Sequence, residues 1–398
     1  MKWSSALSRK PDLEAALDAL AEHTLAALGE TPDLVFVFAS RQHRIGFDRI
    51  GRGLRERLGA VRVVGCSASG VIGDGQEAEH EAAVGLTAAC LPGVDIDYWR
   101  LEAGDLGPGT AHSQRLAALA AAASDEPVQL LVLADPFSFP TERLLRSLDH
   151  AFDRSVISGG LASGGNAPGE CALFLDQRLW YTGALVVALG GDIDMLTAVA
   201  QGCRPIGDPL FVSACDDGRI TGLDGRRPYD VLNDLFAAAS AADRELMQHS
   251  LFLGLAMRPG EQAYTQGDFL VRNVIGGDAD SGALRVGASV HPNQVVQFHL
   301  RDAATSAADL EQTLARLDAG IGAARPAGGL LFSCTGRGAG LYGVAGHDSS
   351  LVHAALGALP LGGFFCNGEI GQVAGVPFVH GYTSAVALFR PRGDVARD

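Results

Sequence analysis

The sequence predicts a mixed α/β (α+β) protein of two domains, with largely antiparallel, mixed sheets and helices on their outer faces. The chain has 398 residues, of which 47% are hydrophobic, enough for two domains of ordinary size. Apolar runs of strand length alternate with stripes of helical periodicity. Strands at 182–220 and 250–303 follow one another closely, which argues against a purely parallel, doubly wound sheet.

An internal repeat organises most of these elements. The first copy follows a helix that begins near Leu13 and ends at Gly29. Each copy is predicted as strand, helix, strand with a glycine-flanked polar turn, and strand. The copies are expected at 34–40, 46–58, 61–70 and 82–91; at 129–135, 141–152, 155–165 and 182–191; and at 329–336, 348–356, 361–372 and 383–389. The recurrence of this order indicates an internal structural repeat.

A different set of elements lies between the second and third copies. Strands at 194–207 and 210–220 are expected to pair, followed by a helix at about 228–247 and four strands. These four strands are predicted at 250–257, 268–278, 283–290 and 295–303. The next helix is predicted to begin at a capping box of Ser306 and Asp309 and to end at Gly320.

A turn-rich, charged stretch at 222–228 is the predicted domain boundary. The expected division is an N-terminal helix at 1–33, a first domain at 34–225, a second domain at 226–389 and a tail at 390–398.

Charge and composition exclude several function classes. The net charge is -15 and no run rich in Lys or Arg occurs, so neither nucleic acid nor an anionic membrane surface is an expected partner. No signal-peptide core and no apolar run of about 20 residues is present. The seven cysteines form no C-x-x-C, and no H-x-x-x-H occurs. We therefore expect a cytoplasmic protein with reduced thiols and without a metal site or other cofactor.

The motifs of the repeats and of the intervening strands resemble the FIST family (F-box and intracellular signal transduction proteins). The resemblance rests on GCSASGVIG, SGGLASGG, AQGCRPIG, FLVRNVIGGD, VQFHLRDA, LLFSCTGRG, LGGFFCNGEIGQV and FVHGYTSAVALF, and it spans about residues 34–389. It assigns 34–225 to a FIST N-terminal domain and 226–389 to a FIST C-terminal domain. It implies a bacterial sensory module for small ligands, including amino acids, whose output is a separate signalling protein or the chain's own oligomeric state.

Charged residues at strand ends are the first candidates for a ligand site. They are Arg272, Arg301, Asp302, Arg337 and Glu369. Arginine presents a fork suited to a carboxylate, and Glu or Asp suits an ammonium group, so together they fit a zwitterion such as an amino acid. The alternative is that they form ion pairs that lock sheet ends together. The neighbouring Asp348 is interpreted as a helix cap.

The glycine-flanked turns and strand tips supply the remaining candidates, which are Cys66, Ser67, Gly159, Gly160, Cys334, Cys366 and Asn367. The cysteines are interpreted as sharing a repeat position. Each is either a sensing or nucleophilic thiol or a small buried residue at a crowded turn. The glycine-rich segment SGGLASGG leads to a strand, not to a helix N-terminus, and is expected to form a tight turn or a backbone-lined pocket wall.

These observations favour a non-catalytic sensor whose pocket lies where the glycine turns meet the strand ends. Two alternatives remain open. One is an acyl-transfer enzyme or hydrolase that uses Cys66 or Cys366. The other is a scaffold that binds protein partners.

Overall fold

The computed structural model describes residues 1–59, 62–122, 127–152, 154–216, 218–258, 260–261, 263–322 and 324–392. It divides into two compact units. The first contains Met1–Val199, Glu311–Val379 and the chain from Thr383 onward, and the second contains Ala200–Leu310 and His380–Tyr382. Residues 393–398 of the predicted tail lie outside the described residues.

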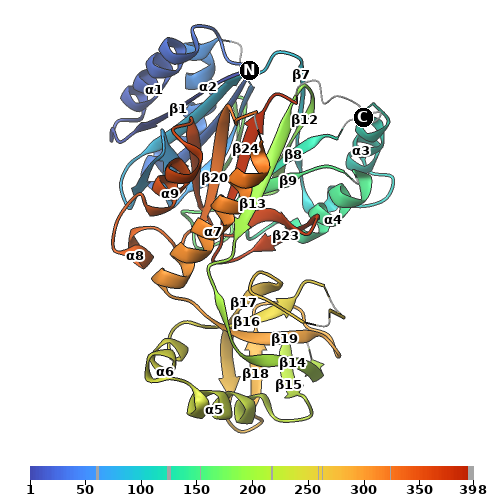
Figure 1. Cartoon of the computed structure of the whole chain (residues 1–398). Helices are drawn as coiled ribbons and strands as arrows, with labels where there is room; N and C mark the ends of the chain where they lie inside the picture. The colour runs from blue at the N-terminus through green and yellow to red at the C-terminus, as the bar shows by residue number, and fades with distance from the viewer. Residues whose placement is uncertain are drawn as a thin grey trace. The chain divides into compact units, whose positions relative to one another are not determined.

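The first unit consists of three copies of one series of elements (Figure 1). The first copy contains β1 (Lys2–Ser8), α1 (Leu13–Leu28), β2 (Leu34–Ser40), η1 (Arg41–Gly46), α2 (Phe47–Leu58), β3 (Arg62–Ala68), β4 (Gly70–Gly73), β5 (Gln76–Glu79) and β6 (Val84–Cys90). The second contains β7 (Val94–Leu101), η2 (Ala103–Asp105), α3 (Ala111–Ala122), β8 (Gln129–Ala134), α4 (Thr141–Ala151), β9 (Ile157–Leu161), β10 (Leu173–Leu175), β11 (Arg178–Trp180) and β12 (Ala184–Gly191).

The third copy begins with β13 (Asp194–Ala200) and resumes after the second unit. It continues with α7 (Ala303–Ile321), β20 (Gly328–Cys334), α8 (Ala339–Tyr342), α9 (His347–Leu356), β21 (Leu361–Cys366), β22 (Glu369–Val373), β23 (Val376–His380) and β24 (Ser384–Arg390). The longer segment of the second unit thus follows the first strand of the third copy along the chain and ends within α7, at Leu310.

Strand pairing is the same in all three copies. The central strand of each pairs in parallel with the next strand, as β2 does with β3, β8 with β9 and β20 with β21. It also pairs antiparallel with the last strand, which is β6, β12 or β24. The predicted repeat and the mixed fold class are therefore confirmed.

Each copy donates a hairpin to the sheet of another copy. The resulting six-stranded sheets have the orders β1-β6-β2-β3-β10-β11, β7-β12-β8-β9-β22-β23 and β13-β24-β20-β21-β4-β5. The hairpin of the second copy extends the first sheet, that of the third extends the second, and that of the first extends the third. The three copies are therefore joined in a closed cycle of backbone hydrogen bonds.

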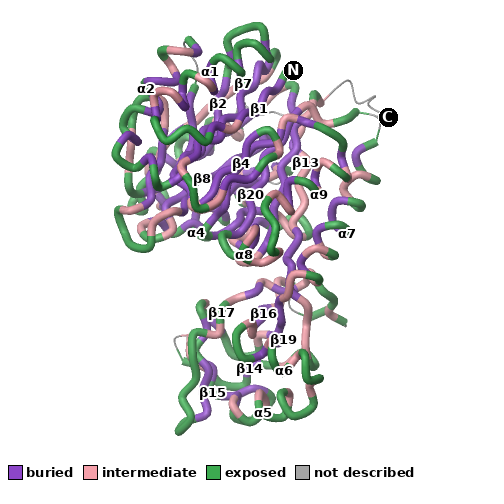
Figure 2. Tube along the Cα trace, turned by 90° about the vertical axis from the view of Figure 1, so that its left-hand side faces the viewer, coloured by how far each residue is buried: buried purple, intermediate pink, exposed green. Residues whose placement is uncertain are grey.

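The inner faces of the three sheets meet in one apolar core. Its centre is a cavity of about 10 Å³ lined by side chains from all three sheets, namely Phe36, Phe38, Val64, Leu131, Leu133, Leu185, Val187, Leu330 and Phe332. The outer faces of the first two sheets are covered by helices, α1 and α2 on one and α3 and α4 on the other. Figure 2 shows the buried strands inside and the exposed helix faces outside.

A glycine stands at the same place in the second parallel strand of every copy. Built Cβ atoms at Gly65, Gly159 and Gly363 would lie 1.7, 1.9 and 1.9 Å from a carbonyl oxygen of the paired strand. The φ angles of Gly159 and Gly363 are 145° and 141°, which residues with a side chain rarely adopt. The glycines of the turn motifs thus permit close approach of two strand backbones.

The second unit contains a closed antiparallel barrel of order β14-β15-β18-β17-β16-β19. Its strands are β14 (Arg204–Asp216), β15 (Arg219–Leu223), β16 (Leu251–Ala256), β17 (Phe269–Asp278), β18 (Ala283–Val286) and β19 (Val295–Leu300). Helix α5 (Pro228–Ala238) packs on the barrel core, and α6 (Ala241–Met247) follows it. Closure leaves no long unpaired edge in this small sheet.

Several sequence-based predictions differ from the structure. The helix predicted at about 228–247 is two helices, α5 and α6, separated at Ala239 and Ser240. The segment before Leu13 forms strand β1, which pairs antiparallel with β6 and is buried over four consecutive residues, 3–6. Strand β13 lies next to β24 and does not pair with β14. Helix α7 begins at Ala303, and the Asp302 side chain accepts the Thr305 N–H at 2.7 Å, so the predicted capping box is wrong.

Substitution of the close-approach glycines is expected to disrupt the first unit. We predict that Gly159→Ala lowers the free energy of unfolding by more than about 3 kcal/mol, because the methyl group would overlap the Val132 carbonyl. Gly320→Ala, on the open face of helix α7, is the control and should stabilise by up to about 1 kcal/mol. Urea unfolding followed by circular dichroism measures both. Equal stability of the two variants would refute the close-approach argument.

The buried His299 is expected to make stability depend on pH. Burial lowers the pKa of His299 to about 4, although its Nδ1 contacts the Gln297 carbonyl at 3.0 Å. The unfolded chain binds this proton below about pH 6.5, and the folded chain does so only near pH 4. Stability should therefore fall by about 3 kcal/mol between these values from this residue alone. The free energy of unfolding is measured against pH for the native protein and for His299→Phe. The difference between the two curves isolates His299, since His43 and His112 titrate in both proteins. Identical pH profiles would contradict the prediction.

Candidate functional site

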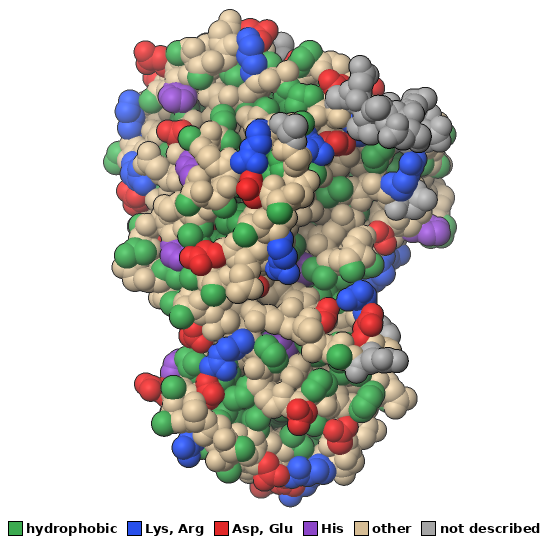
Figure 3. Space-filling view, viewed as in Figure 1, with side chains coloured by type: hydrophobic (Ala, Val, Ile, Leu, Met, Phe, Trp, Pro, Cys, Tyr) green, Lys and Arg blue, Asp and Glu red, His purple; other side chains and the backbone are tan. Residues whose placement is uncertain are grey.

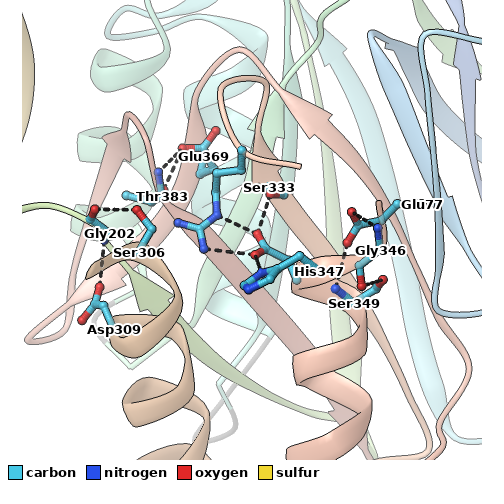
Figure 4. Close-up of polar contacts among 12 residues, drawn as sticks. Glu77, Gly202, Ser306, Asp309, Ser333, Gly346, His347, Ser349, Glu369 and Thr383 are labelled. Carbon is cyan, nitrogen blue, oxygen red and sulfur yellow. Dashed lines mark hydrogen bonds and ion pairs between the residues drawn. The ribbon is translucent and has the colours of Figure 1, made fainter. Parts of the chain in front are cut away.

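The carboxylate of Glu369 is fully buried at the start of β22. Its Oε2 accepts hydrogen bonds from the Thr383 backbone N–H at 3.1 Å and from the Thr383 hydroxyl at 2.7 Å (Figure 4). Thr383 immediately precedes β24, so the two residues join the exchanged hairpin of the third copy to its own last strand. The carboxylate is held in place by two donors of one residue.

The strand register identifies the residues that replace Glu369 in the other two copies. They are Val71 and Leu173, both buried in the central apolar core. The equivalent cross-strand pairs are Val71 with Phe364, Leu173 with Cys66, and Glu369 with Gly160. An apolar side chain therefore satisfies the fold at this position, and the carboxylate is an addition specific to the third copy.

Three more polar side chains break the repeat beside Glu369. The buried pair Ser333 and Ser384 replaces Ala39 with Val84 in the first copy and Ala134 with Ala184 in the second. Thr383 is equivalent to Ala83 in the first copy and Gly183 in the second. In each copy the carbonyl of this residue accepts a hydrogen bond from the backbone N–H at the tip of the central strand. The Ser384 hydroxyl has no hydrogen-bond partner within the described part of the chain. At these positions, which lie at one end of its sheet, the third copy is thus polar and the other two are apolar or small, although the next residue of the central strand, Cys334 in the third copy, is Ser40 in the first and Asp135 in the second.

Arg337 and Asp348 form a bidentate ion pair at this end of the sheet. The distances are 2.6 Å from Arg337 Nε to Asp348 Oδ2 and 3.1 Å from Nη2 to Oδ1. Asp348 also accepts the Ser333 hydroxyl at 2.8 Å and contacts His347 Nδ1 at 3.1 Å. The His347 ring stacks on Tyr342 with centroids 3.5 Å apart. Ser333, Arg337, His347, Asp348, Glu369, Thr383 and Ser384 are called the polar cluster below.

The charges of this ion pair are fixed by proximity. Burial opposes ionisation of both groups, but each attracts the other strongly enough to overcome this cost. The pKa of Arg337 is therefore raised, and the pKa of Asp348 lies well below its usual range. The interpretation of Asp348 as a helix cap is wrong, because α9 begins after Gly346 without a side-chain cap and Asp348 instead faces Arg337.

Two carboxylates of the first copy hold the helices of the third. Glu77 on β5 accepts N–H groups of Gly346 at 3.1 Å and Ser349 at 2.8 Å, at the start of α9. Glu79 accepts the Ala339 N–H at 2.9 Å, at the start of α8. Burial raises the pKa of Glu77, while the bond from Ser349 partly opposes the shift. These contacts position the segment that carries Arg337 and Asp348.

The predicted cysteines do not share a repeat position. By register, Cys66 corresponds to Phe364, Cys366 corresponds to Ala68, and Cys334 lies at the tip of the central strand β20. All three are buried, and burial raises the pKa of the Cys66 and Cys366 thiols well above the ordinary value. These thiols would be protonated near neutral pH, which opposes a role as nucleophiles.

The predicted turn residues mostly join one copy to another. The Ser67 hydroxyl donates to the Ser163 carbonyl and accepts the Ala172 N–H, both at 2.9 Å. Gly160 leaves room for Cys366, whose sulfur would lie 2.4 Å from a Cβ built there. The exposed Asn367 donates its backbone N–H to the Leu161 carbonyl at 3.0 Å.

Three predicted residues belong to the second unit, and the other nine belong to the first. Arg301 is buried with its guanidinium 5.1 Å from the Tyr382 ring centre. Arg272 donates to the Val271 carbonyl at 3.1 Å, and Asp302 caps α7 and lies 3.6 Å from Arg204. The structure therefore brings Cys334, Arg337 and Glu369 to one end of the third sheet, and Arg272, Arg301 and Asp302 belong to a separate unit.

The residues that sequence reasoning missed are Ser333, Thr383 and Ser384. A residue-by-residue alignment of the three copies would have found them as polar exceptions. No group of three or more His, Cys, Asp or Glu side chains in the described ranges could hold a metal ion. No described helix is long and apolar enough to cross a membrane.

Family comparison places this architecture among known proteins. The FIST N domain matches residues 33–226, and the FIST C domain matches residues 228–372. The chain belongs to the FIST family. FIST domains are associated with signal transduction and sensing. An uncharacterized protein of Mycobacterium tuberculosis (strain ATCC 25618 / H37Rv) is 34% identical over 398 residues, covering 98% of this chain and 100% of the relative. One of Mycobacterium bovis (strain ATCC BAA-935 / AF2122/97) is 34% identical over 382 residues, covering 94% and 95%.

Breaking the buried ion pair of this FIST protein is expected to be costly. We predict that Asp348→Asn lowers the free energy of unfolding by about 3–5 kcal/mol, because Arg337 keeps its buried charge and loses its partner. The control is Asp318→Asn in the exposed pair with Arg325, which should change stability by less than about 1 kcal/mol. Urea unfolding measures both. A loss of less than 1 kcal/mol for Asp348→Asn would contradict the assignment.

Proposed function

We propose that this FIST protein is a non-catalytic sensor that binds a small molecule at the polar cluster of the third copy. One observation carries the proposal. Four buried positions, those of Ser333, Glu369, Thr383 and Ser384, are polar in the third copy and apolar or small in the other two. Since the same strands assemble without polar groups there, the cost of burying them is better explained by a ligand than by the fold.

The chemistry of the cluster indicates the ligand class. A buried carboxylate recognises an ammonium or another hydrogen-bond donor, and hydroxyl groups both donate and accept. Arg337 provides a guanidinium suited to a carboxylate, although Asp348 already occupies part of its fork. A small zwitterion such as an amino acid satisfies these groups together.

The polypeptide backbone connects the polar cluster directly to a residue of the second unit, which could carry the signal of ligand binding. Thr383, which holds Glu369, directly follows Tyr382, and Tyr382 belongs to the second unit. There its ring lies 4.3 Å from that of Phe252 and against Arg301, and its φ angle is 68°. A ligand that moves Thr383 would change the backbone of this strained residue. We propose that a signalling protein, or a second copy of the chain, recognises the resulting conformation of the second unit.

Three further features support a cytoplasmic sensor over the alternatives. None of the seven cysteines, all of which the structure describes, forms a disulfide, which suits a reducing compartment. The buried thiols of Cys66 and Cys366 have raised pKa values, which favours the non-catalytic interpretation. Figure 3 shows acidic and basic side chains interspersed on the face drawn, without a continuous basic patch, which fits a small-molecule ligand better than nucleic acid.

A thermal-shift screen with Glu369 variants tests the proposal. We expect at least one amino acid, amine or small carboxylate to raise the melting temperature, since a ligand at 100 times its Kd stabilises by about 2.7 kcal/mol. Glu369→Gln should keep the native fold and lose the shift. Glu369→Leu should also fold, because Leu173 occupies the equivalent place in the second copy.

The control is Asp135→Ala, which removes a different buried carboxylate, one in the second copy that accepts the Ser138 N–H at 2.8 Å. It should lower the melting temperature of the unliganded protein and retain the ligand shift. The proposal fails if no compound stabilises the native protein or if Glu369→Gln binds as well as the native chain. Unfolding of both Glu369 variants would show that the carboxylate is structural.

A further inference from the structure

A pocket of about 370 Å³ lies between the first and second copies and contains no residue of the polar cluster. It is lined by Arg41, Arg44, Gly164, Asn166 and Glu170. The two arginines belong to η1, directly after the tip of β2, and the other three residues belong to the loop that connects β9 to β10. The volume falls within the range of small-molecule sites.

Two glycines shape the loop side of this pocket. Gly164 has a φ angle of 87°, and a Cβ built on it would lie 2.7 Å from the Ala68 carbonyl oxygen and 3.4 Å from Arg41 Cβ. A Cβ on Gly165 would lie 2.4 Å from Glu170 Cβ. The absence of both side chains lets the loop approach Arg41 and leaves room for Glu170. This loop is the glycine-rich segment that the sequence predicted as a turn or a pocket wall.

The carboxylate of Glu170 is oriented by its own loop. Its Oε2 accepts the Asn166 backbone N–H at 2.8 Å, and the Glu170 N–H donates to the Ala167 carbonyl at 3.2 Å. One wall of the pocket therefore presents a positioned acceptor. A carboxylate accepts hydrogen bonds from hydroxyl and ammonium groups.

The other lining segment, η1, contributes two exposed arginines, Arg41 and Arg44. Within the described residues, the guanidinium groups of Arg41 and Arg44 have no hydrogen-bond or ion-pair partner, whereas those of Arg49, Arg55 and Arg57 in the following helix are paired with carboxylates. The three charged side chains of the pocket sum to +1, which favours an anion. Arginine forks bind carboxylates in a bidentate manner.

We propose that this pocket is a second ligand site, which binds a small carboxylate that carries a hydrogen-bond donor at its other end. Arg41 and Arg44 hold the carboxylate of the ligand, and Glu170 accepts its hydroxyl or ammonium group. The site shares no residue with the polar cluster, so occupancy of one can be measured while the other is disabled.

Isothermal titration calorimetry with a matched ligand series tests the site. The probes are propanoate, 3-hydroxypropanoate, 3-aminopropanoate and inorganic phosphate, titrated into the full chain carrying Glu369→Gln. We expect both substituted propanoates to bind more tightly than propanoate. Arg41→Ala/Arg44→Ala should raise their Kd by about tenfold or more. Glu170→Gln should reduce the preference for the amino compound and leave propanoate binding unchanged.

The control is Arg52→Ala, an exposed arginine of α2 outside the pocket, which should leave every Kd unchanged. Arg41→Lys/Arg44→Lys keeps the charge but not the fork and should recover only part of the affinity. Circular dichroism confirms that the variants fold. The proposal is overturned if no propanoate binds the chain with intact Arg41, Arg44 and Glu170, if phosphate binds most tightly, or if Arg52→Ala weakens binding as much as the pocket variants.

Discussion

The exchange of hairpins among three copies is the constraint on which the first unit depends. In each copy the second parallel strand would be an open sheet edge, with unpaired N–H and C=O groups, unless a hairpin of another copy covered it. Because the exchange closes in a cycle, no copy completes its sheet alone. The three inner faces are consequently held against one another, and the small central cavity shows how closely they pack.

Closed cyclic packing also explains how a polar site can be accommodated. Two copies build the same strands with Val71 and Leu173, so the backbone does not require the carboxylate of Glu369. The third copy buries polar groups at one end of its sheet and satisfies them locally, through Thr383 for Glu369 and through Arg337 and Ser333 for Asp348. The unit tolerates the unfavourable free energy of burying these polar groups because the other two copies supply much of its apolar core. Because the repeat diverges in one copy, the polar cluster occurs once in a unit with threefold internal similarity.

Much of the fold could be predicted from local pattern, and the candidate site only in part. The strands of each copy are short apolar runs and the helices have regular stripes, so their order and recurrence are visible in the chain. The hairpins β4–β5 and β22–β23 are short, and nothing in their sequence names the copy whose sheet they join. Glu369 and Arg337 were predicted because charged residues are unusual on apolar strands. Ser333 and Ser384 were missed because a buried serine resembles any small strand residue until its equivalents are known.

The sequence by itself determined the fold class, the threefold repeat and the FIST family, because each is written in local periodicity and contiguous motifs. The tertiary structure alone decided which distant groups meet. Glu77 reaches the helix that begins 270 residues later, and Asp348 binds Arg337 rather than capping its own helix. The run LGGFFCNGEIGQ, predicted as one strand and a turn, forms two strands of different sheets, β21 and β22. Gly363 in this run allows the close approach of a neighbouring strand backbone, and the Glu369 carboxylate accepts a hydrogen bond from Thr383. Pairing across long separations depends on register and burial, and a linear pattern does not specify either.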